Sequence, residues 1–178
     1  MGLPPGYAIR PATAEDLPLL PAIERGAARL FAPFDAGETE DVDVSADLAL
    51  TSAALAAGRL WVAVFGTRVV GFALATIIDG EAHLHEMDVL PDHGRRGLGR
   101  ALVAALRRWT VARGLPAITL STRQDVPFNG PFYVRLGFTV AADEQLTPGL
   151  RRLRRQEQRR GLDVSRRAIM RLALPRAS

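Results

Sequence analysis

VLPDHGRRGLGRALV, residues 89–103, is the stretch of the chain that decides the fold. It reads as a strand that ends at Pro91, a turn rich in Gly and Arg, and the start of an amphipathic helix. The first N–H groups of a helix have no partner within the helix, and the helix dipole favours an anion beside them. This order of strand, turn and helix therefore predicts a site for a phosphate group.

The composition of the turn supports that interpretation. Its glycines let the backbone approach a phosphate closely, and its arginines add cationic hydrogen-bond donors. An ordinary turn with solvent-facing arginines is the competing interpretation. The turn lacks the Gly-Lys-Ser/Thr ending of a Walker loop, and it does not match the G-x-G-x-x-G dinucleotide fingerprint. The residues concerned are Gly94, Gly97, Gly99, Arg95, Arg96 and Arg100.

Other elements are expected on both sides of this stretch. Short turns at 66–68 and 79–80 predict that the strands they join form an antiparallel meander. Mixed strands and helices, with no linker between them, indicate one domain over 1–178 of the α+β (mixed α/β) class. The predicted strands are 7–10, 60–65, 69–78, 82–90, 117–122, 138–141 and 168–174, and the predicted helices are 14–30, 45–57, 98–113, 128–136 and one in the Arg-rich stretch.

Composition limits the kind of protein. The chain has 178 residues and 48% hydrophobic residues, enough for the core of one globular domain. Cysteine is absent, which excludes disulfides, thiolate metal sites and a cysteine nucleophile and suits the cytoplasm. No apolar run approaches the ~20 residues of a membrane span, and MGLPPGYAIRPATAED lacks the order of a secretory signal. We expect a soluble cytoplasmic protein without a membrane partner.

Charge is unevenly distributed around a formal net charge of +4. All 23 basic residues are Arg. Residues 35–47 are acidic, whereas residues 151–167 are rich in Arg. A solvated helix face is the commoner reason for such a basic run, and no aromatic residue lies within 149–178 to stack on bases. Nucleic acid is therefore not the expected partner.

Residues 89–99 resemble the phosphate-binding motif of the GCN5-related N-acetyltransferase (GNAT) superfamily. The family pattern is V-x-P-x-x-R/Q-x-x-G-x-G/A, and the chain departs from it at Gly94, where Arg or Gln is usual. The resemblance implies the GNAT fold, a central, mostly antiparallel twisted sheet flanked by helices with a V-shaped opening near the coenzyme site. It also implies acetyl-CoA as co-substrate, with its pyrophosphate on the backbone of residues 94–99 and its pantetheine arm paired with the strand at 87–89. The implied coenzyme contacts are Met87, Asp88, Val89, Gly94, Arg95, Arg96, Gly97, Leu98, Gly99 and Arg100.

A second motif, NGPFYVRLGF at 129–138, is similar to the family's downstream pattern of an Asn ahead of a helix that ends in aromatic-Tyr-x-x-x-Gly-Phe. The resemblance implies that Asn129, Phe132 and Tyr133 contact the coenzyme and that Tyr133 faces the thioester sulfur. A phenol there can protonate the departing thiolate. Helix capping by Asn129 and burial of both aromatic rings in the core are the competing interpretations.

Candidate bases lie in AHLHEMDV, residues 82–89. Strand alternation places His83, His85 and Met87 on one face and Glu86 on the other. The H-x-H spacing is similar to that of the arylalkylamine N-acetyltransferases, in which both His lie near the acceptor amine and relay its proton through water. His titrates near neutrality and suits this role, and Glu86 is the rival base. Two hydrogen-bonded strand His are the competing interpretation, and two His without a third ligand do not favour a metal.

In the family, the first two helices and their connecting loop cover the acceptor. An acidic segment attracts a cationic amine, so Glu24, Asp41 and Asp43 are candidate acceptor contacts, although a solvated loop has the same composition. We expect acetyl transfer to a primary amine by direct attack in a ternary complex, with a small cationic amine as acceptor. A non-catalytic acyl-CoA sensor and a peptide or protein N-acetyltransferase are the alternatives. Relatives frequently dimerise, so a homodimer paired through an exposed final strand is also expected.

Overall fold

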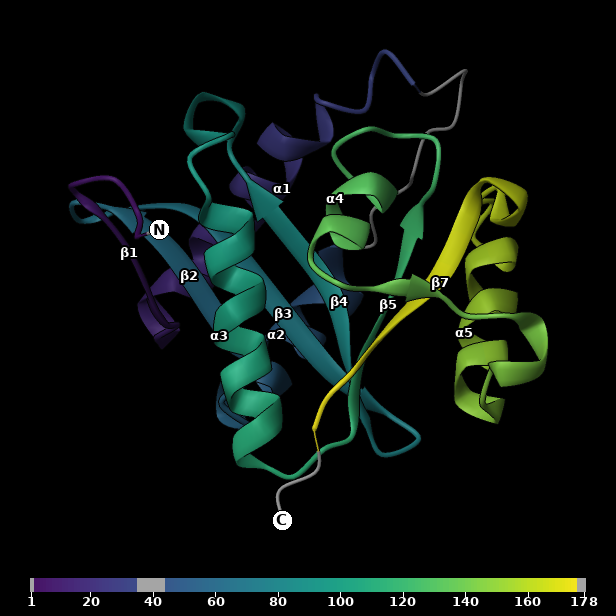
Figure 1. The fold of residues 1–178 in the computed structure, drawn as a ribbon. Coiled ribbons are helices and arrows are strands. Elements are labelled where there is room, and N and C mark those ends of the chain that lie inside the picture. The colour runs from purple at the N-terminus through teal and green to yellow at the C-terminus, as the bar shows by residue number, and fades with distance from the viewer. Residues whose placement is uncertain (1, 35–43, 176–178) are drawn as a thin grey trace. The chain divides into compact units, whose positions relative to one another are not determined.

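The computed structural model of the chain describes residues 2–34 and 44–175, which fall into two units. Unit 1 contains Met1–Ala32, Val42–Thr76 and Leu84–Trp109, and unit 2 contains Pro33–Asp41, Ile77–His83 and Thr110–Ser178. Strands β3 (Arg68–Ile78) and β4 (Glu81–Val89) contribute to both units. Each unit combines strands with helices, in agreement with the predicted α+β class (Figure 1).

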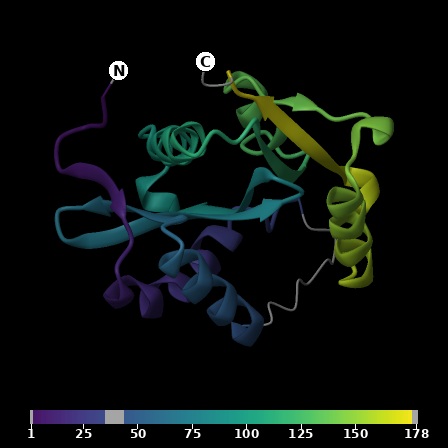
Figure 2. The same cartoon turned by 90° about the horizontal axis from the view of Figure 1, so that it is seen from below.

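Unit 1 has a mostly apolar sheet with helices on both faces. Its strands lie in the order β1-β2-β3-β4, with β2 antiparallel to β1 and β3. Figure 2 shows α1 and α2 beneath these strands and α3 above them. The elements are β1 (Tyr7–Pro11), the 3₁₀ turn η1 (Ala14–Leu19), α1 (Leu20–Ala28), α2 (Val44–Ala56), β2 (Leu60–Phe65), β3, β4, the 3₁₀ turn η2 (Pro91–His93) and most of α3 (Leu98–Ala112).

The hairpin between β3 and β4 follows the sequence prediction. Asp79 and Gly80 separate the two strands and have φ of 48° and 82°. Two successive positive φ values define the tight turn that best matches the twist of two antiparallel strands. Beneath the sheet, Leu20 and Ile23 of α1 pack with Leu60 and Phe72 in one buried cluster. Helix α1 thus buries one apolar side against the sheet.

The first helical segment differs from the prediction of one helix over 14–30. The chain forms η1 first and becomes α-helical only at Leu20, with Pro21 in the first turn. Proline lacks an N–H group and is tolerated only where that donor has no partner within the helix. Pro21 therefore fits the first turn of the nine-residue helix α1, whereas Pro18 lies within the tight turn η1.

Asp16 joins this turn to β1. Its side chain is buried, and it accepts hydrogen bonds from the Arg10 guanidinium at 2.7 and 2.8 Å and from the Thr13 N–H at 2.7 Å. The Arg10 hydrogen bond, together with those from Thr13, lowers the pKa of Asp16 below its ordinary 3.8 although burial opposes the shift. The ionised carboxylate therefore stabilises the folded state.

We expect Asp16→Asn to lower the free energy of unfolding by about 1–2 kcal/mol at neutral pH, because Arg10 loses its charged partner and is itself partly exposed. A carboxyl whose folded pKa is depressed contributes its stability above the ordinary 3.8 and loses it as the pH falls through the folded value. Urea unfolding should therefore show a difference between wild type and variant at neutral pH that shrinks in strong acid. An equal difference at both pH values would contradict this role.

Unit 2 has a second group of strands, in the order β5-β7-β6, with β7 antiparallel to both neighbours. The expectation that the final strand is an exposed edge is wrong. Strand β7 is paired on both sides, because the chain returns after α5 to enter between β5 and the two-residue β6. The elements are β5 (Ala117–Arg123), α4 (Gly130–Arg135), β6 (Thr139–Val140), the 3₁₀ turns η3 (Asp143–Gln145) and η4 (Val164–Arg166), α5 (Pro148–Arg159) and β7 (Arg167–Ala173).

Helix α5 carries the Arg-rich stretch and lies beside β7 (Figure 1). Its buried side packs Leu150 against Leu146 and Ile169. At its N-terminus, the Asp79 carboxylate accepts a hydrogen bond from the Gly149 N–H at 2.6 Å. The opposite side exposes arginines, as predicted for a solvated helix face.

Candidate functional site

The loop between β4 and α3 has the conformation expected of an anion-binding turn. Arg95 and Gly97 have φ of 56° and 84°, in the left-handed region that favours Gly. The Ala101 N–H makes an early bond of α3, to the Gly97 carbonyl at 3.0 Å. The N–H groups just before Ala101 therefore belong to the first turn of the helix, whose donors have no partner within the helix. This loop and helix end lie wholly in unit 1.

The surroundings of the loop fit a diphosphate. A Cβ built on Gly97 would have only Leu3 Cδ2 near it, at 4.0 Å, so the space beside this backbone is open. Arg95, Arg96 and Arg100 have exposed side chains, and none forms an ion pair within the described part of the chain. Backbone donors and cationic side chains are thus present together at the N-terminus of α3.

An aromatic group that sequence reasoning missed supports this loop. The Tyr7 hydroxyl and His93 Nδ1 are 2.8 Å apart, and the Tyr7 ring lies 4.7 Å from that of Phe65. The Arg96 guanidinium lies over the Tyr7 ring, 5.8 Å from its centre, and also donates to the Asp92 carbonyl at 3.3 Å. These contacts involve His93 and Arg96, which lie on either side of Gly94, and no local sequence signal indicates them.

Gly94 itself does not require the conformational freedom of glycine. Its φ of −63° and ψ of 164° are open to any L-residue. A Cβ there would lie 3.1 Å from the Pro91 carbonyl oxygen, so a side chain would need the turn backbone to shift by a few tenths of an ångström. The turn is closed instead by the backbone, since the Gly94 N–H donates to that same carbonyl at 3.0 Å.

Strand β4 approaches β3 closely at the predicted pantetheine segment. A Cβ on Gly71 would lie 2.6 Å from the Asp88 carbonyl oxygen and 3.2 Å from the Val89 Cα. Glycine is thus required in β3 at the point where β4 leads into the loop. Met87, Asp88 and Val89 are each half-buried.

The candidate bases differ in their surroundings. His83 is buried in unit 2, with Nδ1 2.9 Å from the Thr119 hydroxyl oxygen. His85 is exposed and Glu86 is half-buried, and both belong to unit 1. Strand alternation therefore does not give the two His the same exposure, and Thr119 is a partner that the sequence pattern did not reveal.

Tyr133 lies in α4 of unit 2 within an aromatic cluster. Its ring is buried and makes edge-on contacts with Phe132 at 5.1 Å and Phe138 at 5.6 Å between ring centres. Phe138 is fully buried, whereas Phe132 is half-buried. Asn129 stands at the N-cap position of α4, as the capping interpretation expects, but its side chain makes no cap hydrogen bond.

Helix α4 also begins later than the predicted residue 128. It starts at Gly130, where a Cβ would lie 3.1 Å from the Arg123 carbonyl oxygen and from the Gln124 Cα. The close approach of β5 therefore leaves little room for a side chain at the start of the helix that carries Tyr133.

Of the candidate acceptor contacts, Glu24 lies half-buried in α1, while Asp41 and Asp43 are outside the described residues. Nearby in sequence, Phe34 is held by a group that the sequence did not predict. Arg123 and Arg166 each donate to the Phe34 carbonyl at 3.0 Å, and both donate to Asp125. Hydrogen bonds from Arg123 and then Arg166 hold the pKa of Asp125 well below its ordinary value. Unit 2 thus anchors the chain just before the acidic segment.

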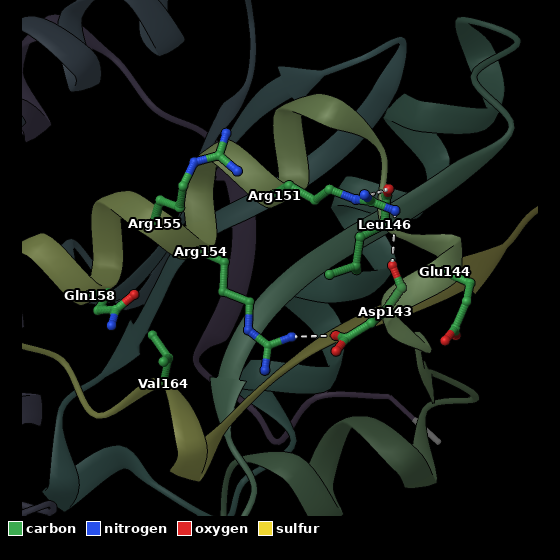
Figure 3. A pocket seen from close by; sticks show the side chains of 8 residues that line it. All are labelled: Asp143, Glu144, Leu146, Arg151, Arg154, Arg155, Gln158 and Val164. Carbon is green, nitrogen blue, oxygen red and sulfur yellow. Dashed lines mark hydrogen bonds and ion pairs between the residues drawn. The ribbon is translucent and has the colours of Figure 1, made fainter.

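A hollow of about 480 Å³ lies over the Arg-rich helix, and none of the predicted site residues lines it (Figure 3). Arg154 pairs with Asp143 at 2.7 Å, and Arg151 donates to the Leu146 and Asp143 carbonyls at 3.0 and 3.2 Å. These arginines tie α5 to the η3 turn. Part of the basic run is therefore accounted for by contacts within the fold.

The residues that the structure describes also bear on membrane and metal binding. None of the helices there is long and apolar enough to cross a membrane. The same residues hold no cluster of three or more His, Cys, Asp or Glu side chains placed to bind a metal ion.

Comparison with known proteins connects this chain with acetyltransferases. Residues 26–138 match the family described as acetyltransferase (GNAT) family. The chain is similar to the PaiA N-acetyltransferase from Thermoplasma acidophilum in complex with coenzyme A, at 17% identity and a TM-score of 0.72 over 94% of this chain and 99% of that one. It is also similar to YncA, a putative acetyltransferase from Salmonella typhimurium with its cofactor acetyl-CoA, at 20% identity and a TM-score of 0.65 over 97% and 96%. A third similar structure is the ribosomal-protein-S18-alanine N-acetyltransferase from Escherichia coli, at 22% identity and a TM-score of 0.61 over 97% and 96%.

Proposed function

Because the chain belongs to the acetyltransferase (GNAT) family, we propose that it transfers an acetyl group from acetyl-CoA to a primary amine. The observation that carries this proposal is the β4–loop–α3 arrangement. Arg95 and Gly97 adopt left-handed backbone conformations just before α3. The N–H groups of the first turn of α3 follow them, and exposed arginines lie beside these N–H groups in the sequence. The family membership indicates which ligand to expect, and these features provide hydrogen-bond donors that suit its pyrophosphate.

The coenzyme contacts follow from this arrangement. The backbone of residues 94–99 holds the pyrophosphate, and Arg95, Arg96 and Arg100 add charge-assisted hydrogen bonds. The strand at Met87–Val89 pairs with the pantetheine arm, and Asn129 and Phe132 contact the coenzyme from α4. These assignments come from the family pattern, and the open backbone at Gly97 supports the one that concerns the pyrophosphate.

The chemistry needs no covalent enzyme intermediate, because a thioester is already activated. The acceptor nitrogen attacks the thioester carbonyl in a ternary complex, the new C–N bond forms, and the C–S bond breaks. A base chosen from His83, His85 and Glu86 takes the proton of the amine, and Tyr133 gives a proton to the leaving thiolate. A backbone N–H near Met87 stabilises the oxyanion.

We propose a small cationic amine as acceptor, contacted by Glu24, Asp41 and Asp43. An excess of carboxylates attracts a cation through their summed field, an effect that added salt screens. The enzyme is proposed to act in the cytoplasm as a single domain, and a homodimer is the proposed assembly, through a surface other than β7.

Thiol release from acetyl-CoA, measured with a panel of amines, tests this function. The panel should include polyamines, arylalkylamines and peptides with a free N-terminal alanine, since an alanine N-acetyltransferase is among the similar structures. We expect turnover with at least one small cationic amine and a KM that rises with salt. Turnover confined to peptides would show that the proposed acceptor class is wrong and that the proposed reaction, acetyl transfer to an amine, is right.

Calorimetric titration with CoA separates the remaining alternative. Binding of CoA without turnover of any amine would favour an acyl-CoA sensor. No binding of CoA to the folded protein would overturn both the enzyme and the sensor.

A further inference from the structure

We propose that Asp125 is a positioning residue for acceptor binding. It directs two arginines, Arg123 and Arg166, to the main-chain carbonyl of Phe34, and we call these four residues the Phe34 clasp. All four lie in unit 2, although up to 132 positions of sequence separate them. The geometry of the clasp comes from contacts within the chain, and only its effect on the acceptor rests on the proposed function.

The carboxylate of Asp125 lies between the two guanidinium groups. Arg123 donates to it through Nε at 3.2 Å and Nη2 at 3.0 Å, and Arg166 donates to it through Nε at 3.0 Å and also through Nη2. The same two Nη2 atoms each donate to the Phe34 carbonyl oxygen at 3.0 Å, and a carbonyl oxygen can accept two hydrogen bonds. One carboxylate therefore aims two cations at a single main-chain oxygen.

Removal of the carboxylate charge would leave two like charges close together. Arg123 is only 6% exposed, so water screens its charge poorly. Repulsion then favours separation of the guanidinium groups, and the more exposed Arg166 can turn towards solvent. The Phe34 carbonyl would lose at least one of its two donors. Hydrogen bonds from Arg123 and then Arg166 lower the pKa of Asp125, so the charge that holds the clasp is present throughout the neutral range.

The clasp lies on the same sheet face as a candidate base. Arg123 and Thr119 are four residues apart in β5, so their side chains project from one face and their Cα atoms lie about 13 Å apart. The Thr119 hydroxyl oxygen lies 2.9 Å from Nδ1 of the candidate base His83. The body of a small amine can cover much of this span when its nitrogen approaches that end of the face.

The ring of Phe34 gives the clasp a surface that an acceptor can contact. It packs edge-on against the ring of Phe128, with 5.9 Å between the ring centres, and Phe128 is 38% exposed. Phe128 directly precedes Asn129, a proposed coenzyme contact. The carbonyl hydrogen bonds therefore fix an aromatic pair that adjoins a proposed coenzyme contact in the chain, and the non-reacting part of the acceptor packs on this pair.

Chymotrypsin tests the clasp without any need for activity. This protease cleaves after aromatic residues and must bind the carbonyl oxygen of the cleaved bond in its own oxyanion hole, so the bond after Phe34 is protected while the arginines hold that oxygen. Cleavage after the fully buried Phe138 reports global unfolding. We expect Asp125→Asn to raise the rate of cleavage after Phe34, relative to that after Phe138, about tenfold. The same ratio in wild type and variant would overturn the clasp.

Asp143→Asn is the matched control for the cleavage measurement. It breaks another Asp–Arg pair of unit 2, between Asp143 and Arg154, which has no contact with the Phe34 carbonyl. We expect it to leave the cleavage ratio at the wild-type value. A rise in the ratio equal to that of Asp125→Asn would also overturn the clasp, because loss of any ion pair in the unit would then have the same effect.

Steady-state kinetics test the link to the acceptor. With an active amine, we expect Asp125→Asn to raise the KM for the amine about tenfold and to leave kcat and the KM for acetyl-CoA within about twofold. The lost contacts bind the acceptor equally in the ground state and in the transition state, so the effect falls on KM. Asp125→Glu keeps the charge and should restore most of the acceptor affinity. An unchanged KM for the amine in Asp125→Asn would overturn the positioning role.

A second variant and the two readouts keep this proposal separate from the proposed function. Arg166→Gln removes one of the two donors to the Phe34 carbonyl and should change both measurements in the same direction by a smaller factor, so it serves if Asp125→Asn does not fold. An inactive wild type would defeat the proposed function together with the link to an acceptor. The cleavage ratios would still establish or overturn the clasp itself.

Discussion

Replacing Tyr133 by Phe is expected to lower kcat for acetyl transfer by about 100-fold while the protein still folds and still binds CoA. The substitution removes one hydroxyl and keeps the ring, whose contacts with Phe132 and Phe138 place it in the aromatic cluster of α4. The departing thiolate then leaves without a proton donor, so the loss should appear in kcat. Steady-state thiol release and calorimetric CoA titration measure the two quantities.

The only other tyrosine of the chain provides a matched control. Tyr7→Phe removes the hydroxyl that lies 2.8 Å from His93 Nδ1, in the loop between β4 and α3. We expect this control to weaken CoA binding by a few fold, through loss of one hydrogen bond, and to keep kcat at saturating acetyl-CoA. If Tyr133→Phe retained its kcat within about twofold, or lost CoA affinity instead, the proton-donor role would be wrong.

The parts of the site that could be predicted from sequence are those set by neighbouring residues. Pro91 ends a strand, Gly97 has a positive φ, and the spacing after Leu98 defines a helix face. The position of the loop and the turn that leads into the helix were therefore predictable. The turn at Asp79-Gly80 was predictable for the same reason. In each case the conformational preference of one or two residues decides the local backbone.

The parts that could not be predicted depend on which distant segments meet. Tyr7 reaches His93 across 86 positions, and Arg166 reaches Phe34 across 132. Neither pair has a local signal, because the sequence around an aromatic or a basic residue does not show which distant residue it contacts. The pairing of β7 on both sides is a similar case, since the local sequence of a strand does not show which strands lie beside it. The alternation of β4 gives the faces of His83 and His85 and does not give their different exposures.

Gly97→Val is expected to weaken CoA binding by about 100-fold, or about 2.7 kcal/mol. At a φ of 84° a β-branched residue is an outlier, so the backbone of the variant must leave the left-handed region. That change turns the N–H groups of the loop and of the first turn of α3 away from their common direction. The expected loss therefore comes from the direction of the amides, because a Cβ at this position meets no close neighbour in the chain.

Gly80→Val is the matched control for the same backbone strain. Gly80 has a φ of 82°, and a Cβ there would have nothing within 4 Å, but it lies in the turn between β3 and β4. Both variants should lose stability in urea unfolding, since each places a branched side chain at positive φ. Only Gly97→Val should lose CoA affinity by calorimetry. Equal CoA affinities of the two variants would show that the loop amides do not hold the diphosphate, because the strain common to both would then account for every effect of the Gly97 substitution.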